Sequence, residues 1–280
     1  MATIVDAIVN LVREPVTALE RVHQSQNRAN GMGDALEEYV KDLFAGTFHA
    51  TDSERLDAYS RTFSYLGNSV SPPDAMLRGG DAIEVKKIAS PNAPLALNSS
   101  YPKQTLAADN PMISEACRRA EDWQRKDMLY VVGNVCGNRL RNISMVYGLD
   151  YCASEACYQR LKSTIRNGVN AIEGVEFAES RELGHVNRVD PLGITYLRVR
   201  GMWGIENPWT VFNYVYRRDM ENDLNFMCLI NDRKWNALPQ TNRLVELAQA
   251  ESRLQISSVR IKDPDNPARL NEAKLITYAL

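Results

Sequence analysis

The sequence has 280 residues, a formal net charge of −2, 44% hydrophobic residues and 24% charged residues, which is the composition of a globular protein long enough for one large domain. It contains no run of 18 apolar residues, and its first residues place no basic segment before an apolar one, so we expect neither a membrane-spanning helix nor a secretory signal. The five cysteines are an odd set without zinc-ligand spacing, which predicts reduced thiols and a cytoplasmic protein.

Two helices separated by a polar loop are the first elements expected along the chain. Apolar periodicity predicts helices over 4–24 and 33–44, with the loop at 25–31. The apolar stripe of the second helix consists of Leu36, Val40, Leu43 and Phe44. Glu37 borders this stripe, so its carboxylate should lie at the edge of the core, where it could reach a metal on the following hairpin and act as a catalytic residue. An ordinary surface glutamate would fit the same pattern.

A strand predicted at 61–66 leads into a hairpin whose three-residue loop is 78–80. This loop would pair Asp74 with Glu84, and its last position, a glycine, suits a left-handed conformation. Because side chains alternate faces along a strand, Asp74, Glu84 and Lys86 would then project to one side. A two-residue turn would shift the register by one and put Asp74 on the opposite face.

These three side chains are what a metal-dependent phosphodiesterase needs. Magnesium prefers oxygen ligands and typically takes one or two carboxylates together with a substrate phosphate. Asp74 and Glu84 would supply the carboxylates, and Val85 a backbone carbonyl oxygen, while Lys86 would orient water and stabilise negative charge. In-line attack would leave a 5′-phosphate and a 3′-hydroxyl. The pattern predicts a nuclease; the alternative is a surface hairpin with a Glu84–Lys86 ion pair.

The rest of the chain is expected to alternate between helices and strands. Helices are predicted at 113–125, 154–172 and 241–250, and strands at 128–133, 194–199, 225–230 and 256–261. The strand at 128–133 is apolar almost throughout, which is typical of a buried parallel strand. We therefore expect an α/β fold, with a mixed central sheet flanked by helices, in a single domain over 1–280 with recognition loops inserted.

Polar loops around the hairpin have the amide, hydroxyl and guanidinium groups that fit the edges of DNA bases. The residues expected to contact DNA are Asn27, Arg28, Asn30, Lys87, Asn98, Ser99, Ser100, Lys103, Arg198 and Arg200. Each of these loops could equally be an ordinary polar turn. The net charge of −2 argues against a non-specific DNA binder, but a local basic cleft is enough for a site-specific nuclease.

Several stretches resemble known nucleases. The order Pro73-Asp74…Glu84-Val85-Lys86, preceded by Glu37 on a helix, resembles the PD-(D/E)xK superfamily. More narrowly, NRANGMGDALEEY at 27–39, GDAIEVKKI at 80–88 and LNSSYPK at 97–103 resemble the NgoPII-like type II restriction endonucleases.

The resemblance implies a restriction-endonuclease-like fold, with Asp74 and Glu84 as metal ligands, Lys86 as the catalytic lysine and Glu37 as the helix acid. It also implies a GGCC target in double-stranded DNA, Mg²⁺ as the cofactor with Mn²⁺ as a substitute, a homodimer, and a cognate DNA methyltransferase as a functional partner.

Two other functions fit the same residues. A repair or recombination nuclease of this fold would cut by DNA structure, and a non-enzymatic DNA-binding protein would carry the motif by accident. The polar loops favour an enzyme that cuts both strands of a short palindrome, and the twofold symmetry of such a site predicts a homodimer. A serine hydrolase and a nucleotide-binding enzyme are disfavoured, because neither a nucleophile-elbow pattern nor a phosphate-binding glycine loop occurs.

Overall fold

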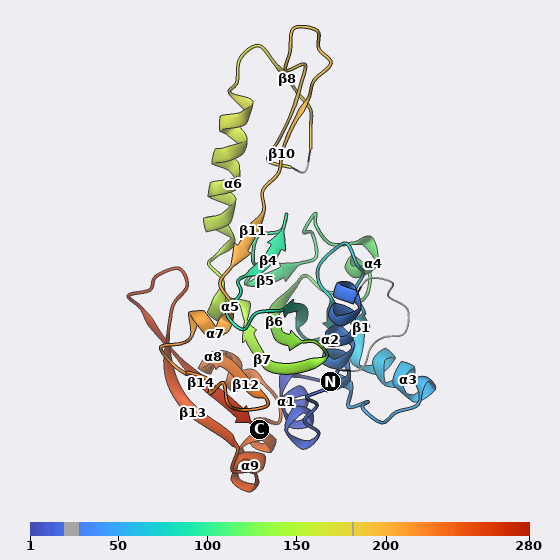
Figure 1. Cartoon of the computed structure of the whole chain (residues 1–280), viewed down its shortest axis with the longest axis vertical. Helices are drawn as coiled ribbons and strands as arrows, with labels where there is room; N and C mark the ends of the chain where they lie inside the picture. Colours follow the sequence, from blue (N-terminus) through green and yellow to red (C-terminus); the bar gives the residue numbers. More distant parts are fainter. Residues whose placement is uncertain (20–27, 181) are drawn as a thin grey trace.

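A mixed β-sheet runs through the centre of the computed structural model, which describes residues 1–19, 28–180 and 182–280 (Figure 1). The strands of this sheet are, from edge to edge, β1 (Phe63–Tyr65), β2 (Ala75–Leu77), β3 (Ala82–Ile88), β6 (Arg125–Cys136), β7 (Arg139–Tyr147), β12 (Asn225–Asn231), β14 (Leu270–Ala279) and β13 (Leu254–Lys262), with β5 (Thr105–Ala107) paired to β6. Strand β3 is parallel to β6, and β7 is parallel to β12. The other neighbouring strands are antiparallel.

Helices cover both faces of the sheet. The described helices are α1 (Ile4–Arg13), α2 (Arg28–Ala45), α3 (Asp52–Thr62), α4 (Glu115–Arg118), α5 (Gly148–Tyr151), α6 (Glu155–Asn170), α7 (Pro208–Val211), α8 (Asp232–Ala237) and α9 (Thr241–Ala250). Apolar side chains of α1, α2 and α9 form one core with one face of the sheet, and those of α4, α5 and α7 form a second core with the other face. The predicted α/β fold, a mixed central sheet flanked by helices, is therefore confirmed.

Several predicted elements match the observed ones. Helix α9 coincides with the helix predicted at 241–250, and α6 lies within the one predicted at 154–172. Strands β6, β12 and β13 contain the strands predicted at 128–133, 225–230 and 256–261. The parallel pairing expected for 128–133 is present between β3 and β6.

Other helix boundaries were predicted wrongly. Helix α1 ends at Arg13 rather than at 24, because a proline at 15 disfavours the helical conformation of the residue before it, and Glu14 has left that conformation (φ −132°, ψ 68°). Helix α2 begins at Arg28, so part of the loop predicted at 25–31 is helical. Only α4 remains of the helix predicted over 113–125.

Helix α2 packs closely over β6 because one strand residue lacks a side chain. A Cβ atom at Gly133 of β6 would lie 2.7 Å from a terminal methyl group of Leu36 and 3.3 Å from Leu140. Leu36 is fully buried, so it has little room to move aside. The absence of a side chain at Gly133 thus sets the distance at which α2, and with it Glu37, lies from the sheet.

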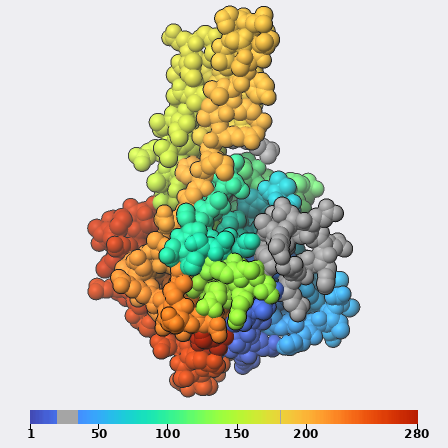
Figure 2. All heavy atoms as spheres, viewed as in Figure 1, coloured from blue at the N-terminus to red at the C-terminus, as the bar shows by residue number. Residues whose placement is uncertain are grey.

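An arm formed by residues 155–202 projects from this body (Figure 1). It contains α6 and a small antiparallel sheet of β8 (Glu176–Phe177), β9 (Gly184–Asn187) and β10 (Leu197–Val199). The strand predicted at 194–199 is reduced to β10. Figure 2 shows the arm as a column standing above the body. Where the arm joins the body, β11 (Trp203–Ile205) pairs with β4 (Leu95–Asn98).

No helix within the described residues combines the length and the apolar character that crossing a bilayer would require.

We predict that Gly133→Val lowers the free energy of unfolding by about 1–3 kcal/mol, because the added methyl groups overlap Leu36 in a packed core. Thermal and urea denaturation would measure the loss. Gly168→Ala is the matched control, since a Cβ at Gly168 of α6 meets no atom within 4 Å. A Gly133→Val protein as stable as the wild type would show that α2 is not held at this distance by the glycine.

Candidate active site

Strands β2 and β3 form the predicted hairpin in the predicted register. Ala75 faces Ile83, and the backbone N–H of Asp74 donates to the carbonyl oxygen of Ile83 at 3.0 Å. Continuing this register by one residue places Asp74 opposite Glu84. The register prediction, on which a shared face for the two carboxylates depends, is confirmed.

The turn of this hairpin differs in one detail from the prediction. The left-handed residue is Gly79, with φ +66°, and not Gly80 at the end of the loop. The N–H of Gly80 donates to the carbonyl of Leu77 at 3.0 Å, which closes a four-residue turn. In such a turn a positive φ at the third position is the requirement that glycine meets, and this position is Gly79.

The two faces of β3 have different surroundings, as the alternation predicted. Ile83 and Val85 belong to the core that contains the apolar side chains of α2. Asp74, Glu84 and Lys86 line a pocket of about 280 Å³ on the opposite face. The structure therefore brings the acid-x-lysine pair and the preceding aspartate together in one cavity.

Short hydrogen bonds hold the three charged side chains in place. The ammonium group of Lys86 donates to Oε1 of Glu84 at 2.6 Å, and the backbone N–H of Val85 donates to Oδ2 of Asp74 at 2.7 Å. Burial lowers the pKa of Lys86, but the carboxylates of Glu84 and Asp74 outweigh burial and raise it. Lys86 is thus held as a cation beside two acids.

The two carboxylates leave an excess of negative charge in the pocket. Burial first, and then the charge of Glu84, raises the pKa of Asp74 to about 7, although Lys86 and the Val85 N–H oppose the shift. Oε2 of Glu84 is buried and has no hydrogen-bond partner. An orphaned buried carboxylate oxygen is costly unless a cation or donor arrives. The pocket is therefore electrostatically suited to a positively charged ligand.

Glu37 approaches the same charges from α2. Its side chain is half-buried, and its negative charge contributes to the raised pKa values of both Asp74 and Lys86. The neighbouring Glu38 instead pairs with Lys41 at 2.8 Å and with Arg55 at 3.3 Å. Of the two adjacent glutamates, Glu37 is the one whose field reaches the pocket, which was the expectation for the helix acid.

The donors in the pocket suit a hard divalent cation. Within the described residues no group of three or more His, Cys, Asp or Glu side chains could hold a metal ion, so a metal would rely on Asp74 and Glu84. Two carboxylates are the number that magnesium commonly takes from a protein. Since the N–H and C=O of a strand residue point to the same edge, the Val85 carbonyl faces the edge where Asp74 lies. The residues present fit such an ion.

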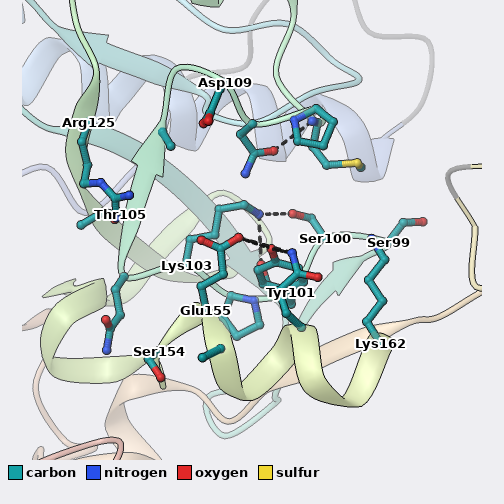
Figure 3. Close-up of a pocket in the computed structure, with 18 residues that line it drawn as sticks. Ser99, Ser100, Tyr101, Lys103, Thr105, Asp109, Arg125, Ser154, Glu155 and Lys162 are labelled. Carbon is teal, nitrogen blue, oxygen red and sulfur yellow. Dashed lines mark hydrogen bonds between the residues drawn. The ribbon is translucent and has the colours of Figure 1, made fainter. Parts of the chain in front are cut away.

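Lys103 brings a second lysine to the pocket. It is buried, and its ammonium group contacts the hydroxyl of Ser100 and the carbonyl of Tyr101 (Figure 3). Burial lowers the pKa of Lys103, whereas the charges of Glu84 and Glu155 oppose this effect. Lys103 also lines an adjoining cavity of about 550 Å³, in which Glu155 accepts a hydrogen bond from the hydroxyl of Tyr101 at 2.7 Å.

The other residues expected to contact DNA are spread over three places. Asn98, Ser99 and Ser100 line the 280 Å³ pocket, and Lys87 lies on β3. Arg198 and Arg200 lie in the arm, where Glu182 accepts a hydrogen bond from each at 2.6 Å. Arg200 also lines a cavity of about 240 Å³ that shares Ser99 with the 280 Å³ pocket, whereas Arg198 lines neither cavity. Asn27 is outside the described residues, and for Arg28 and Asn30 only the backbone of α2 is described.

Sequence reasoning missed two features of this pocket. Tyr130 of β6 pairs with Glu84 in register, and its hydroxyl accepts a hydrogen bond from the Lys103 N–H at 2.7 Å. A lone tyrosine in an apolar strand was the only signal for it. Gly67 has φ +82°, and a Cβ there would lie 2.2 Å from the carbonyl oxygen of Asp74. Glycine at this position lets the preceding loop approach the Asp74 backbone.

Comparisons with known proteins bear on this site. The model of the NgoPII restriction endonuclease family matches residues 2–262. The chain is 57% identical over 278 residues to the type II restriction enzyme NgoPII of Neisseria gonorrhoeae, and the similarity covers 99% of both chains. No solved structure matches the chain significantly.

We predict that Asp74→Asn stabilises the protein in EDTA at pH 8 by about 2–4 kcal/mol. Burial and Glu84 raise the pKa of Asp74, and each pH unit by which this pKa is raised destabilises the folded, ionised state by about 1.4 kcal/mol. Because the pKa of Asp74 is raised in the folded state, the free energy of unfolding of the wild type falls by this amount as the pH rises from about 4 to about 7. The gain of the variant should therefore vanish near pH 4. Urea denaturation across this range would measure it, with the exposed Asp109→Asn as control. Equal stability at pH 8 would contradict the electrostatic picture of the pocket.

Proposed function

Because the chain belongs to the NgoPII restriction endonuclease family, it is a type II restriction enzyme, and we propose that it hydrolyses both strands of a short palindromic DNA site with Asp74, Glu84 and Lys86. The observation that supports these residues is their meeting in one pocket of a hairpin with the predicted register. Cleavage would leave a 5′-phosphate and a 3′-hydroxyl.

Type II restriction enzymes generally need a divalent metal ion, and we propose that this enzyme uses Mg²⁺, with Mn²⁺ as a substitute. Asp74, Glu84 and the Val85 carbonyl would hold the ion. When bound, such an ion lowers the pKa of water and offsets negative charge at phosphorus. The orphaned Oε2 of Glu84 and the raised pKa of Asp74 support a cation here, since each marks negative charge that the protein leaves uncompensated.

Lys86 and Glu37 have different roles in this proposal. The ammonium group of Lys86 has three donors, of which one is committed to Glu84, so another can hold a water in line with the phosphate. Glu37 acts on Lys86 and Asp74 through its field and is a positioning residue. Its negative charge keeps Lys86 protonated and draws cations toward the pocket.

Lys103 and the serines beside it extend the proposed site toward the substrate. Lys103 lies in both cavities, and Ser99 and Ser100 line both as well. A lysine ammonium and two hydroxyls suit contact with phosphate oxygens, which positions DNA without reading its sequence. Asn98 and Lys87 would complete this side of the interface. Base reading would then fall to the polar side chains of the larger cavity, among them Gln104, Asn110 and Arg125.

We propose GGCC as the DNA target and a homodimer as the active assembly. The runs of sequence at 27–39, 80–88 and 97–103 support GGCC as the target, since they carry the resemblance to the NgoPII-like enzymes. A palindrome is cut symmetrically by two copies of one active site, so we propose a homodimer. A cognate methyltransferase would protect the host DNA, and the enzyme would act in the cytoplasm.

The test is digestion of a fully sequenced, unmethylated phage DNA by the purified protein with Mg²⁺ or with EDTA. Discrete bands that need Mg²⁺ and whose ends map to GGCC would support the whole proposal. Discrete bands at another site would remove the target alone, whereas a smear would indicate a nuclease that cuts by DNA structure.

Lys86→Ala belongs in the same digestion. It is expected to lower cleavage at least about a hundredfold while DNA binding in Ca²⁺ remains, because the lysine stabilises charge that develops during the reaction. Asp74→Ala and Glu84→Ala should lose metal-dependent cleavage as well. Full activity in any one of these three variants would overturn the assignment of the site.

Glu37 and Glu38 provide a matched pair of variants on one helix. We predict that Glu37→Gln lowers kcat/KM about tenfold, because a residue that orients the groups in direct contact with a metal typically contributes a factor of about 10–100 to activity. Glu38→Gln should change it less than twofold, since Glu38 pairs with Lys41 and Arg55 away from the pocket. Steady-state cleavage of a short duplex would measure both. Equal effects of the two substitutions would remove Glu37 from the site.

A further inference from the structure

The arm, residues 155–202, exposes an unusual number of apolar side chains. Among the described residues eighteen large hydrophobic side chains are exposed, and ten of them lie in this short segment. They are Leu161, Ile165, Ile172, Phe177, Val189, Leu192, Ile194, Tyr196, Leu197 and Met202. Exposed apolar residues are ordinary when scattered singly, but their concentration on one projecting element marks an interaction surface.

The arm has almost no core of its own. Helix α6 is 16 residues long and buries none of them. Leu161 and Ile165 lie one turn apart on α6, yet their side chains are 50% and 38% exposed, and Ile172, just beyond the helix, is 48% exposed. Since helices in proteins are stabilised mainly by packing of such an apolar stripe, α6 lacks most of the contacts that a helix of this length normally has. A partner would supply them.

The small sheet beside α6 does not meet this need. Its strands have two, four and three residues, and in the described part of the arm only Gly184 and Val186 are buried. Arg166 ties α6 to the loop before β9 by donating to the carbonyl oxygens of Ser180 and Glu182. The helix and the sheet therefore stay together, while their outer apolar side chains remain in water.

The charge balance of the arm indicates what covers it. The sequence 155–202 has seven Arg and Lys residues and six Asp and Glu residues, so the arm is almost neutral. Arg198 and Arg200 are paired with Glu182, and Arg188 is paired with Glu176 at 3.1 Å. A surface that wraps DNA needs an excess of cations for the phosphates. A neutral, apolar surface with paired ions suits another protein surface.

We propose that the arms of two copies of this chain pack against each other about a twofold axis and form the dimer interface. Together the ten side chains expose an area on the order of 1,000 Å², so an interface of roughly 800 Å² per partner would need to cover most of them. An apolar, charge-balanced surface is also complementary to itself, as a twofold interface requires. This inference rests on the proposed function only in that a palindromic site requires two active sites.

Sedimentation of the full-length protein over a range of concentrations tests the interface. Leu192→Glu and Ile194→Glu change the two most exposed apolar residues of the arm, at 76% and 75%, and Ile165→Glu changes α6. Each is expected to weaken dimerisation at least tenfold, because a charge is placed in an apolar contact. Leu56→Glu on α3, 67% exposed and outside the arm, is the matched control and should leave the dimer intact. Circular dichroism would verify that each variant is folded.

The other outcomes separate this inference from the proposed function. A wild-type dimer that all arm variants preserve would overturn the arm interface and leave the homodimer standing. Arm variants that stay dimeric but lose affinity for DNA would show that the arm binds DNA instead. A wild-type monomer that still cuts both strands would overturn the proposed homodimer together with the arm interface.

Discussion

The structure depends on placing two carboxylates side by side in a partly closed pocket. Asp74 and Glu84 repel each other and lose hydration, which opposes folding. The protein offsets only part of this cost, through the Val85 N–H at 2.7 Å and the Lys86 ammonium at 2.6 Å. The remaining cost must be met by the packing of the sheet on its other face. Strain of this kind is expected where a site is built for a ligand rather than for stability.

The rigidity that holds the carboxylates together comes from the start of β3. Asp81, the residue before this strand, accepts hydrogen bonds from the Lys234 ammonium at 2.6 Å and from the Tyr147 hydroxyl at 2.8 Å. Lys234 also donates to Asp127 beside the start of the parallel segment of β6, at 2.7 Å. This network joins α8, β7 and β6 to the start of β3 through groups with little exposure. A shift of the hairpin register would break it, so the register has support from far along the chain.

The parts of the site that the sequence predicted are those decided by nearby residues. A glycine-rich turn fixes the register of Asp74 against Glu84, and alternation along β3 then fixes the faces. Helical spacing likewise favoured Glu37 over Glu38 as the acid near the hairpin. Features set by distant contacts were not predictable, such as the burial of Lys103, whose backbone N–H bonds the Tyr130 hydroxyl of β6. The end of α1 was missed for a different reason, since apolar periodicity was given more weight than Pro15.

The distribution of charge reconciles a net charge of −2 with a DNA substrate. Many cations away from the pocket are neutralised within the chain: Arg55 pairs with Asp42 at 2.7 Å, and Arg253 with Glu251 at 2.8 Å. In the pocket, Lys86 and Lys103 lie beside Asp74 and Glu84, and the field of Glu37 adds to the excess of negative charge there. General attraction for phosphate over the whole surface is therefore weak. Weak general attraction lowers non-specific binding, which leaves discrimination to the contacts with bases.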